Sequence, residues 1–231
     1  MGKIKGVIFD LDGTLIDSLE TYTQALNQGI KKSDLAPVSK EELASLLNTA
    51  MPLEQMLHQL FPAQLKDRQD RLDCIKEIVK AYQKLEQNVP PKPGAAQVLS
   101  SLKEMGLKVG IVTGRTTTGE TKWRELRRLN IDQFIDVIIT GAEAERKPAP
   151  EGIIKCAQEL GLSAEDCVFV GDAQTDIITG KAAGVMTIAI PTGVAQEEIL
   201  SQESPDAIVD SLAELLSKIR ELREERDETH R

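Results

Sequence analysis

Two aspartates stand close together just after the first apolar run of the chain. They are Asp10 and Asp12, within the segment FDLDGT at residues 9–14. On an extended segment this spacing points both carboxylates to the same side, where like charges repel unless a cation lies between them. Mg²⁺ prefers oxygen ligands and would satisfy this requirement. The alternative is a purely structural turn, since Asp-Gly is a common turn dipeptide.

Polar residues also follow three later apolar runs. Thr113 and Gly114 offer a hydroxyl and an unhindered backbone, which suit a phosphate oxygen. Lys147 is a point cation able to neutralise an anion. Asp172 and Asp176 form a second acid pair, with Asp176 expected on the first turn of a helix. Each signal is weak alone, because surface lysines are usually solvated and a helix N-terminal aspartate is often only a cap.

These residues need a scaffold that brings them together, and the apolar runs predict one. Strand-like runs alternate with helical patterns and cover residues 4–10, 108–113, 136–140, 167–171, 186–190 and 207–209. This alternation is typical of an α/β fold, here a doubly wound, Rossmann-like parallel sheet with helices on both faces. Ligands of such sheets lie outside the carboxyl ends of the strands, so we expect all four polar groups at one edge.

The stretch from about residue 18 to 90 breaks the alternation. It contains no strand-like run, its apolar residues repeat with helical spacing, and it is too long for an ordinary connection. We therefore predict an inserted all-helical domain over residues 18–90, with the α/β core formed by residues 1–17 and 91–231. Hinges are expected near residues 15–17 and 89–93.

Composition narrows the class of partner. The 231 residues include 28 basic and 37 acidic side chains, for a net charge of −9, which argues against nucleic-acid and anionic membrane surfaces. The 3 cysteines lack CxxC spacing, so neither a disulfide framework nor a zinc site is expected. No apolar run is long enough to span a bilayer. We expect a cytoplasmic monomer or homodimer that acts on small molecules, with a highly charged tail at residues 218–231 that is either a fraying helix end or disordered.

The four motifs keep an order and spacing that resemble the haloacid dehalogenase-like hydrolase superfamily, in its phosphoglycolate phosphatase-like branch with a helical cap. The resemblance covers residues 3–18 and 93–216, including KPAPE at 147–151 and GKAAGV at 180–185. The helical insertion matches in general character, with Ala50 where the cap pattern often has glycine. Because the cap generally sets the substrate in this family, the resemblance leaves the substrate open.

The resemblance implies a Mg²⁺-dependent phosphatase that acts on a small phosphorylated metabolite through an aspartyl-phosphate. Asp10 would be the nucleophile. Asp12 would act as acid and then base, with a pKa that crowding by other carboxylates moves toward neutrality. The metal would be held by the Asp10 and Asp172 carboxylates and the backbone carbonyl of Asp12, with Asp176 holding a coordinated water.

By the same resemblance, Thr113 and the Gly114 amide would bind the transferring phosphoryl group. Lys147 would offset charge on Asp10 and on the phosphate. Arg115, beside this pair, is expected to be solvated, with substrate contact as the alternative. Two other functions stay open: a sugar phosphomutase of the same branch, and a non-catalytic binding protein on this fold.

Overall fold

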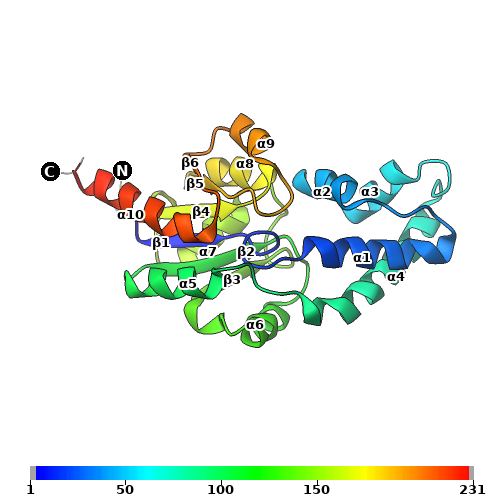
Figure 1. Cartoon of the computed structure of the whole chain (residues 1–231), viewed down its shortest axis with the longest axis horizontal. Coiled ribbons are helices and arrows are strands. Elements are labelled where there is room, and N and C mark those ends of the chain that lie inside the picture. The colour runs from blue at the N-terminus through cyan, green and yellow to red at the C-terminus, as the bar shows by residue number, and fades with distance from the viewer. Residues whose placement is uncertain (1–3, 229–231) are drawn as a thin grey trace.

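A six-stranded parallel sheet with the order β3-β2-β1-β4-β5-β6 forms the centre of the molecule (Figure 1). The structure is a computed structural model that describes residues 4–228. Its strands are β1 Gly6–Phe9, β2 Lys108–Thr113, β3 Val137–Thr140, β4 Cys167–Gly171, β5 Met186–Ala189 and β6 Ala207–Ile208. The predicted α/β fold class and doubly wound sheet are confirmed, and each predicted strand overlaps an observed one.

Helices fill the segments between the strands. The α-helices are α1 Leu19–Ile30, α2 Lys40–Asn48, α3 Leu53–Leu60, α4 Arg68–Leu85, α5 Ala95–Glu104, α6 Gly119–Arg128, α7 Glu151–Glu159, α8 Gln174–Ala183, α9 Glu197–Gln202 and α10 Leu212–Glu228. Short 3₁₀ turns are η1 Lys31–Ser33, η2 Glu86–Asn88, η3 Asp132–Phe134 and η4 Ala164–Asp166. The charged tail is helical through Glu228, and the remainder of that prediction falls outside the described residues.

Both faces of the sheet are buried, which explains the nearly continuous apolar runs of its strands. In β1, Val7 and Phe9 pack into one hydrophobic cluster, whereas Ile8 packs into another. Helices α5, α6 and α10 contribute to the first cluster, and α7 and α8 to the second. None of the described helices is long and apolar enough to cross a bilayer.

The order of the strands places a crevice between β1 and β4. From β1 the chain proceeds outward through β2 to β3, then returns to β4 on the other side of β1 and proceeds to β5 and β6. This reversal is the point where open α/β sheets bind ligands. Phe9 pairs with Val170, so the residues that follow these strands, Asp10 and Asp172, emerge next to each other.

Helices α1 to α4 lie together beyond the carboxyl end of β1 (Figure 1). They have a hydrophobic cluster of their own, which includes Leu26, Leu57 and Ile78. Helices α1 and α4 cross closely at Gly29, where an added Cβ would lie 2.6 Å from the backbone nitrogen of Ile78. The predicted division of the chain at residues 17/18 and 90/91 stays a prediction.

The two segments that join these helices to the sheet run side by side. Ile16 forms an antiparallel bridge with Pro91. The amide of Asp17 donates to the carbonyl of Pro90 at 2.9 Å, and the amide of Lys92 donates to the carbonyl of Leu15 at 2.8 Å. The chain thus enters and leaves the helical region through two adjacent extended segments, at the position where hinges were predicted.

Candidate active site

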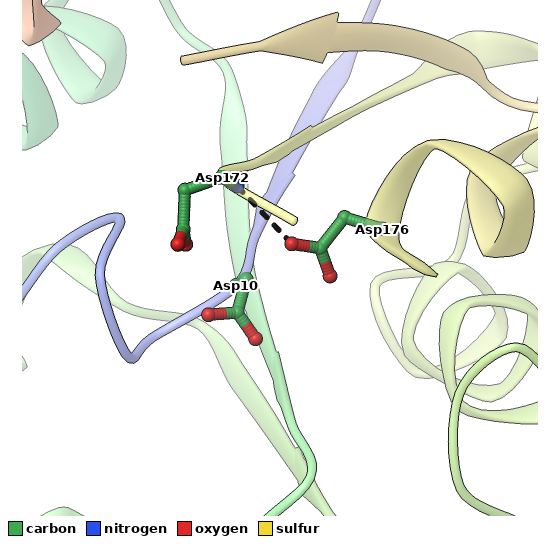
Figure 2. A group of neighbouring side chains, drawn as sticks. All are labelled: Asp10, Asp172 and Asp176. Atoms are coloured by element: carbon green, nitrogen blue, oxygen red, sulfur yellow. Dashed lines mark hydrogen bonds between the residues drawn. The ribbon is translucent and has the colours of Figure 1, made fainter. Parts of the chain in front are cut away.

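Three buried carboxylates meet at the crevice between β1 and β4 (Figure 2). Asp10 follows β1, Asp172 follows β4, and Asp176 lies in the first turn of α8. An oxygen atom from each lies within 4.8 Å of the others, and the residues are 7%, 1% and 2% exposed in that order. The structure therefore brings together three acidic residues that are 162 and 4 positions apart along the chain.

Two of the three carboxylates, those of Asp172 and Asp176, are held in place by hydrogen bonds from neighbouring residues. The Thr14 hydroxyl donates to Oδ1 of Asp172 at 2.7 Å, and the Val194 amide donates to Oδ2 at 2.9 Å. One oxygen of Asp176 accepts the amides of Asp172 at 3.1 Å and Ala173 at 3.0 Å, as a carboxylate at a helix N-terminus commonly does. These bonds leave little rotational freedom to the two side chains.

Glycine is required where the backbone passes the Asp172 carboxylate. Gly13 has a φ of +91°, and a Cβ there would lie 2.4 Å from an Asp172 oxygen. A Cβ on Gly193 would lie 1.8 Å from the same oxygen. Any larger residue at either position would displace the carboxylate, so the Gly of the predicted FDLDGT motif contributes to the shape of the site.

Lys147 supplies a cation to the cluster. Its ammonium donates to Oδ1 of Asp10 at 2.5 Å and to Oδ1 of Asp176 at 2.6 Å, and its side chain is 10% exposed. It also lies 5.2 Å from the centre of the Phe169 ring. The prediction that Lys147 meets the acidic residues is therefore supported by direct contacts, and a solvated surface lysine is excluded.

The charge balance of the cluster favours a further cation. Burial raises the pKa of Asp10 well above its usual range, and Asp176 and Asp172 raise it further although Lys147 opposes them. Burial and Asp176 likewise raise the pKa of Asp172, against the hydrogen bonds from Thr14 and Val194. One ammonium cannot balance three carboxylates. A divalent ion that prefers oxygen ligands, such as Mg²⁺, fits this donor set.

The Asp12 carboxylate lies outside the cluster. Arg115 holds both of its oxygens: Nε donates to Oδ2 at 2.7 Å, and Nη2 donates to Oδ1. Burial alone would raise the pKa of Asp12, but Arg115 outweighs burial and lowers it. The expectation that crowding by carboxylates raises this pKa is therefore wrong for the described arrangement. A metal role for Asp12 depends on its backbone carbonyl alone.

The sequence predicted a solvated side chain for Arg115, and the structure shows a buried one. The side chain is only 8% exposed, and its Nη1 also donates to the Glu125 carboxylate at 3.4 Å. Tyr22 accepts a hydrogen bond from Nε at 2.9 Å. No local sequence pattern indicates these partners, because Asp12 and Tyr22 lie far from residue 115 along the chain and Glu125 lies on the following helix, α6.

Thr113 and Gly114 lie at the end of β2, the neighbour of β1 in the sheet. Thr113 is buried, and its hydroxyl oxygen accepts the Arg115 amide at 3.3 Å. Gly114 is exposed and nothing packs within 4 Å of where its Cβ would lie. Both residues are therefore at the predicted edge of the sheet, with the Gly114 backbone open to a ligand.

A cleft of about 420 Å³ opens beside Lys147, between the α2–α3 loop and the segment after β3. Residues 49–52, Gln55 and 146–148 line it, and Arg146 donates to the carbonyl of Ala50 at 3.3 Å. Ala50 has a φ of +51°, a conformation that favours glycine. Glycine would adopt this conformation without strain.

The sequence interpretation also missed Asn48. It is 5% exposed at the end of α2, and its side-chain oxygen accepts the Gln174 amide at 2.7 Å. Its amide group donates to the Gln174 side chain at 2.9 Å. This pair joins the helical region to the first turn of α8, two residues from Asp176.

Comparisons with known proteins show which family the chain resembles. The model of the haloacid dehalogenase-like hydrolase family matches residues 7–190. Pyrophosphatase PpaX of Halalkalibacterium halodurans is 30% identical over 220 residues, which cover 93% of the chain and 96% of the relative. Phosphoglycolate phosphatase of Rhodospirillum rubrum is 31% identical over 204 residues, which cover 85% of this chain and 83% of the relative.

Two solved structures show the same fold. A predicted phosphoglycolate phosphatase from Haemophilus somnus superposes with a TM-score of 0.83 at 23% identity, over 94% of this chain and 98% of the other. A β-phosphoglucomutase from Clostridium difficile superposes with a TM-score of 0.77 at 20% identity, over 96% of this chain and 98% of the other. At these identities the superpositions concern the fold and not the reaction.

Proposed function

The chain belongs to the haloacid dehalogenase-like hydrolase family, and from this premise we propose that it is a Mg²⁺-dependent phosphatase of small phosphorylated metabolites that forms an aspartyl-phosphate on Asp10. The observation that carries the proposal is the cluster of Asp10, Asp172 and Asp176 around Lys147 at the crevice between β1 and β4. The names of the relatives, a phosphatase and a pyrophosphatase, support phosphoryl chemistry.

In the first half-reaction a carboxylate oxygen of Asp10 attacks phosphorus. The bond between phosphorus and the leaving oxygen breaks, and that oxygen takes a proton from Asp12, which must first bind one although Arg115 lowers its pKa. The product is an aspartyl-phosphate and a free alcohol, which replaces one difficult displacement by two easier ones. Thr113 and the Gly114 amide hold the phosphoryl oxygens, and Lys147 offsets their charge.

In the second half-reaction the Asp12 carboxylate takes a proton from water as the water oxygen attacks phosphorus. The bond from phosphorus to Asp10 breaks, and phosphate leaves. Asp12 thereby regains the proton that it gave up in the first half.

Asp10, Asp172 and the Asp12 carbonyl are the proposed metal ligands, with Asp176 holding a coordinated water. A bound Mg²⁺ would neutralise charge on the phosphate and orient it. Binding of Mg²⁺ also requires Asp10 and Asp172 to be ionised, which their raised pKa values oppose in its absence.

The test is a screen of phosphorylated metabolites with Mg²⁺, scored for free phosphate. Phosphoglycolate and pyrophosphate head the panel because the relatives carry those names. Release of phosphate that stops with excess chelator supports the proposal. Conversion of a sugar phosphate to its isomer without release would favour the phosphomutase, and no turnover across a broad panel would favour a binding protein.

A further inference from the structure

Arg115 occupies the junction between the helical region and the sheet. On the sheet side it forms ion pairs with Asp12 and Glu125. On the helical side its guanidinium carbon lies 5.5 Å from the centre of the Tyr22 ring in α1 and 5.0 Å from that of Tyr82 in α4. We propose that Arg115 is a positioning residue that fixes the Asp12 carboxylate and makes its orientation depend on the seating of helices α1 and α4. The inference rests on the proposed role of Asp12 as acid and base.

The hold on Asp12 is geometrically specific. A guanidinium that donates to both oxygens of one carboxylate fixes the plane of that carboxylate as well as its distance, which an ammonium does not do. The side chains of Arg115 and Asp12 are 8% and 18% exposed, so water does little to loosen the pair. The carboxylate therefore has one strongly preferred direction while Arg115 stays in place.

Arg115 has a second anchor in the sheet unit. Glu125 of α6 accepts from its Nη1 at 3.4 and 3.5 Å, and Glu125 is also paired with the buried Lys122. This anchor comes from the same unit as Asp12. It holds the Nη1 end of the guanidinium wherever the helical region lies.

The aromatic contacts come from the other unit. Tyr22 and Tyr82 are stacked, with ring centres 4.9 Å apart and planes 16° from parallel. Arg115 lies against both rings, which attract a cation through their faces. If the helical region moves about the paired segments at Ile16 and Pro91, the rings leave the guanidinium while Glu125 does not. Movement of the helices then reaches Asp12 through Arg115, in addition to the direct side-chain hydrogen bonds that link Ser18 and Tyr22 to Asp12.

Tyr82 allows the ring to be separated from its hydroxyl. The Tyr82 hydroxyl is buried and has no hydrogen-bond partner within the described part of the chain. Tyr82→Phe therefore keeps the contact between the Arg115 guanidinium and the aromatic ring. Tyr82→Leu removes the ring and leaves an apolar side chain in its place. The pair of variants isolates the cation–ring contact from general packing.

The experiment compares kcat for phenyl phosphate and 4-nitrophenyl phosphate with Mg²⁺. The two substrates have similar shapes, but phenolate is the poorer leaving group and depends more on proton donation by Asp12. Arg115→Met removes the group that lowers the pKa of Asp12, which by itself favours protonation of that carboxylate. We expect the loss of orientation to outweigh this gain and to lower kcat for phenyl phosphate about tenfold more than for 4-nitrophenyl phosphate, because proton transfer commonly contributes about 10²–10⁴-fold. Arg115→Lys should fall between Met and wild type, and the exposed control Arg124→Met should match wild type.

Tyr82→Leu is expected to lower the phenyl phosphate rate about three- to tenfold, by the loss of one ring contact, and Tyr82→Phe to leave it unchanged. This pair also covers the case in which Arg115→Met does not fold. Equal losses on both substrates, a change confined to KM, or equal effects of the two Tyr82 variants would overturn the inference while wild-type phosphatase activity stands. Absence of activity in the wild type toward these substrates and the metabolite panel would instead overturn the proposed function, and the inference with it.

Discussion

Asp10→Asn should abolish turnover and yet make the metal-free protein more stable at pH 7. Burial raises the pKa of Asp10, and Asp176 and Asp172 add to this although Lys147 opposes them. The ionised form is therefore disfavoured in the folded state. Asparagine has nearly the same shape as the protonated carboxyl and carries no charge, so it avoids this cost.

The size of the effect follows from the ordinary pKa of 3.8. Each unit by which the folded-state pKa exceeds that value costs about 1.4 kcal/mol, and at pH 7 the cost is at most about 4 kcal/mol because protonation then limits it. The asparagine amide hydrogens do not all find acceptors in an acidic cluster that also contains Lys147, which reduces the gain. We expect a net increase in the free energy of unfolding of about 1–3 kcal/mol.

The dependence on pH provides the sharper test. Because the folded-state pKa of Asp10 is raised, its stabilising contribution is complete below pH 3.8 and is lost as pH rises toward the folded value. The advantage of Asp10→Asn should therefore be largest at pH 7 and vanish near pH 4. Urea denaturation in excess chelator at both pH values measures it.

A matched control is Asp73→Asn. Asp73 is exposed, and its hydrogen bond from Lys76 lowers its pKa, so this substitution should change stability slightly and in the opposite direction. An Asp10→Asn protein that is less stable than wild type at pH 7, or whose advantage does not change with pH, would refute the electrostatic reasoning.

Three further outcomes follow from the site and the fold. Mg²⁺ should raise the melting temperature of the wild type more at pH 7 than at pH 5, because Asp10 and Asp172 must release protons to bind it, and Asp172→Ala should remove this response; full activity in excess chelator would contradict the metal assignment. Excision of residues 18–90 should leave a folded α/β core, with less helical circular dichroism than the intact chain and without discrimination among phosphorylated substrates; unchanged selectivity would rule out the helical region as the specificity element. Ala50→Gly should raise the free energy of unfolding by about 1 kcal/mol in urea, because glycine adopts a positive φ without strain; a decrease would show that the methyl group makes compensating contacts.

Much of the fold could be predicted because the strands are buried on both faces. Such strands give continuous apolar runs, and the polar residue that ends each run marks where the strand leaves the core. Asp10, Thr113 and Asp172 follow this rule. The position of these residues at one edge required only that the sheet be parallel.

The partners of Arg115 could not be predicted in the same way. Asp12, Tyr22, Tyr82 and Glu125 lie on four separate segments, and nothing in their local sequence distinguishes them from solvated or core residues. Their meeting depends on how the helical region packs on the sheet. The pKa of Asp12 was misjudged for the same reason, since it is decided by the arginine and not by neighbouring carboxylates.

The contact between Asn48 and Gln174 could not be predicted from local sequence either. Asparagine near a helix end is common and usually local in its hydrogen bonds. Here both groups of its side chain bond to a residue 126 positions away. Only the tertiary arrangement reveals that α2 is attached at the first turn of α8.

The central claim is that Asp10 accepts a phosphoryl group, and intact-protein mass measurement after brief mixing with 4-nitrophenyl phosphate and Mg²⁺ tests it most directly. Asp12→Asn should accumulate a phosphoryl adduct, because this leaving group needs little protonation whereas hydrolysis of the intermediate still needs a base. Asp10→Asn should carry no adduct. An adduct on Asp10→Asn, or on neither variant, would contradict covalent catalysis by Asp10.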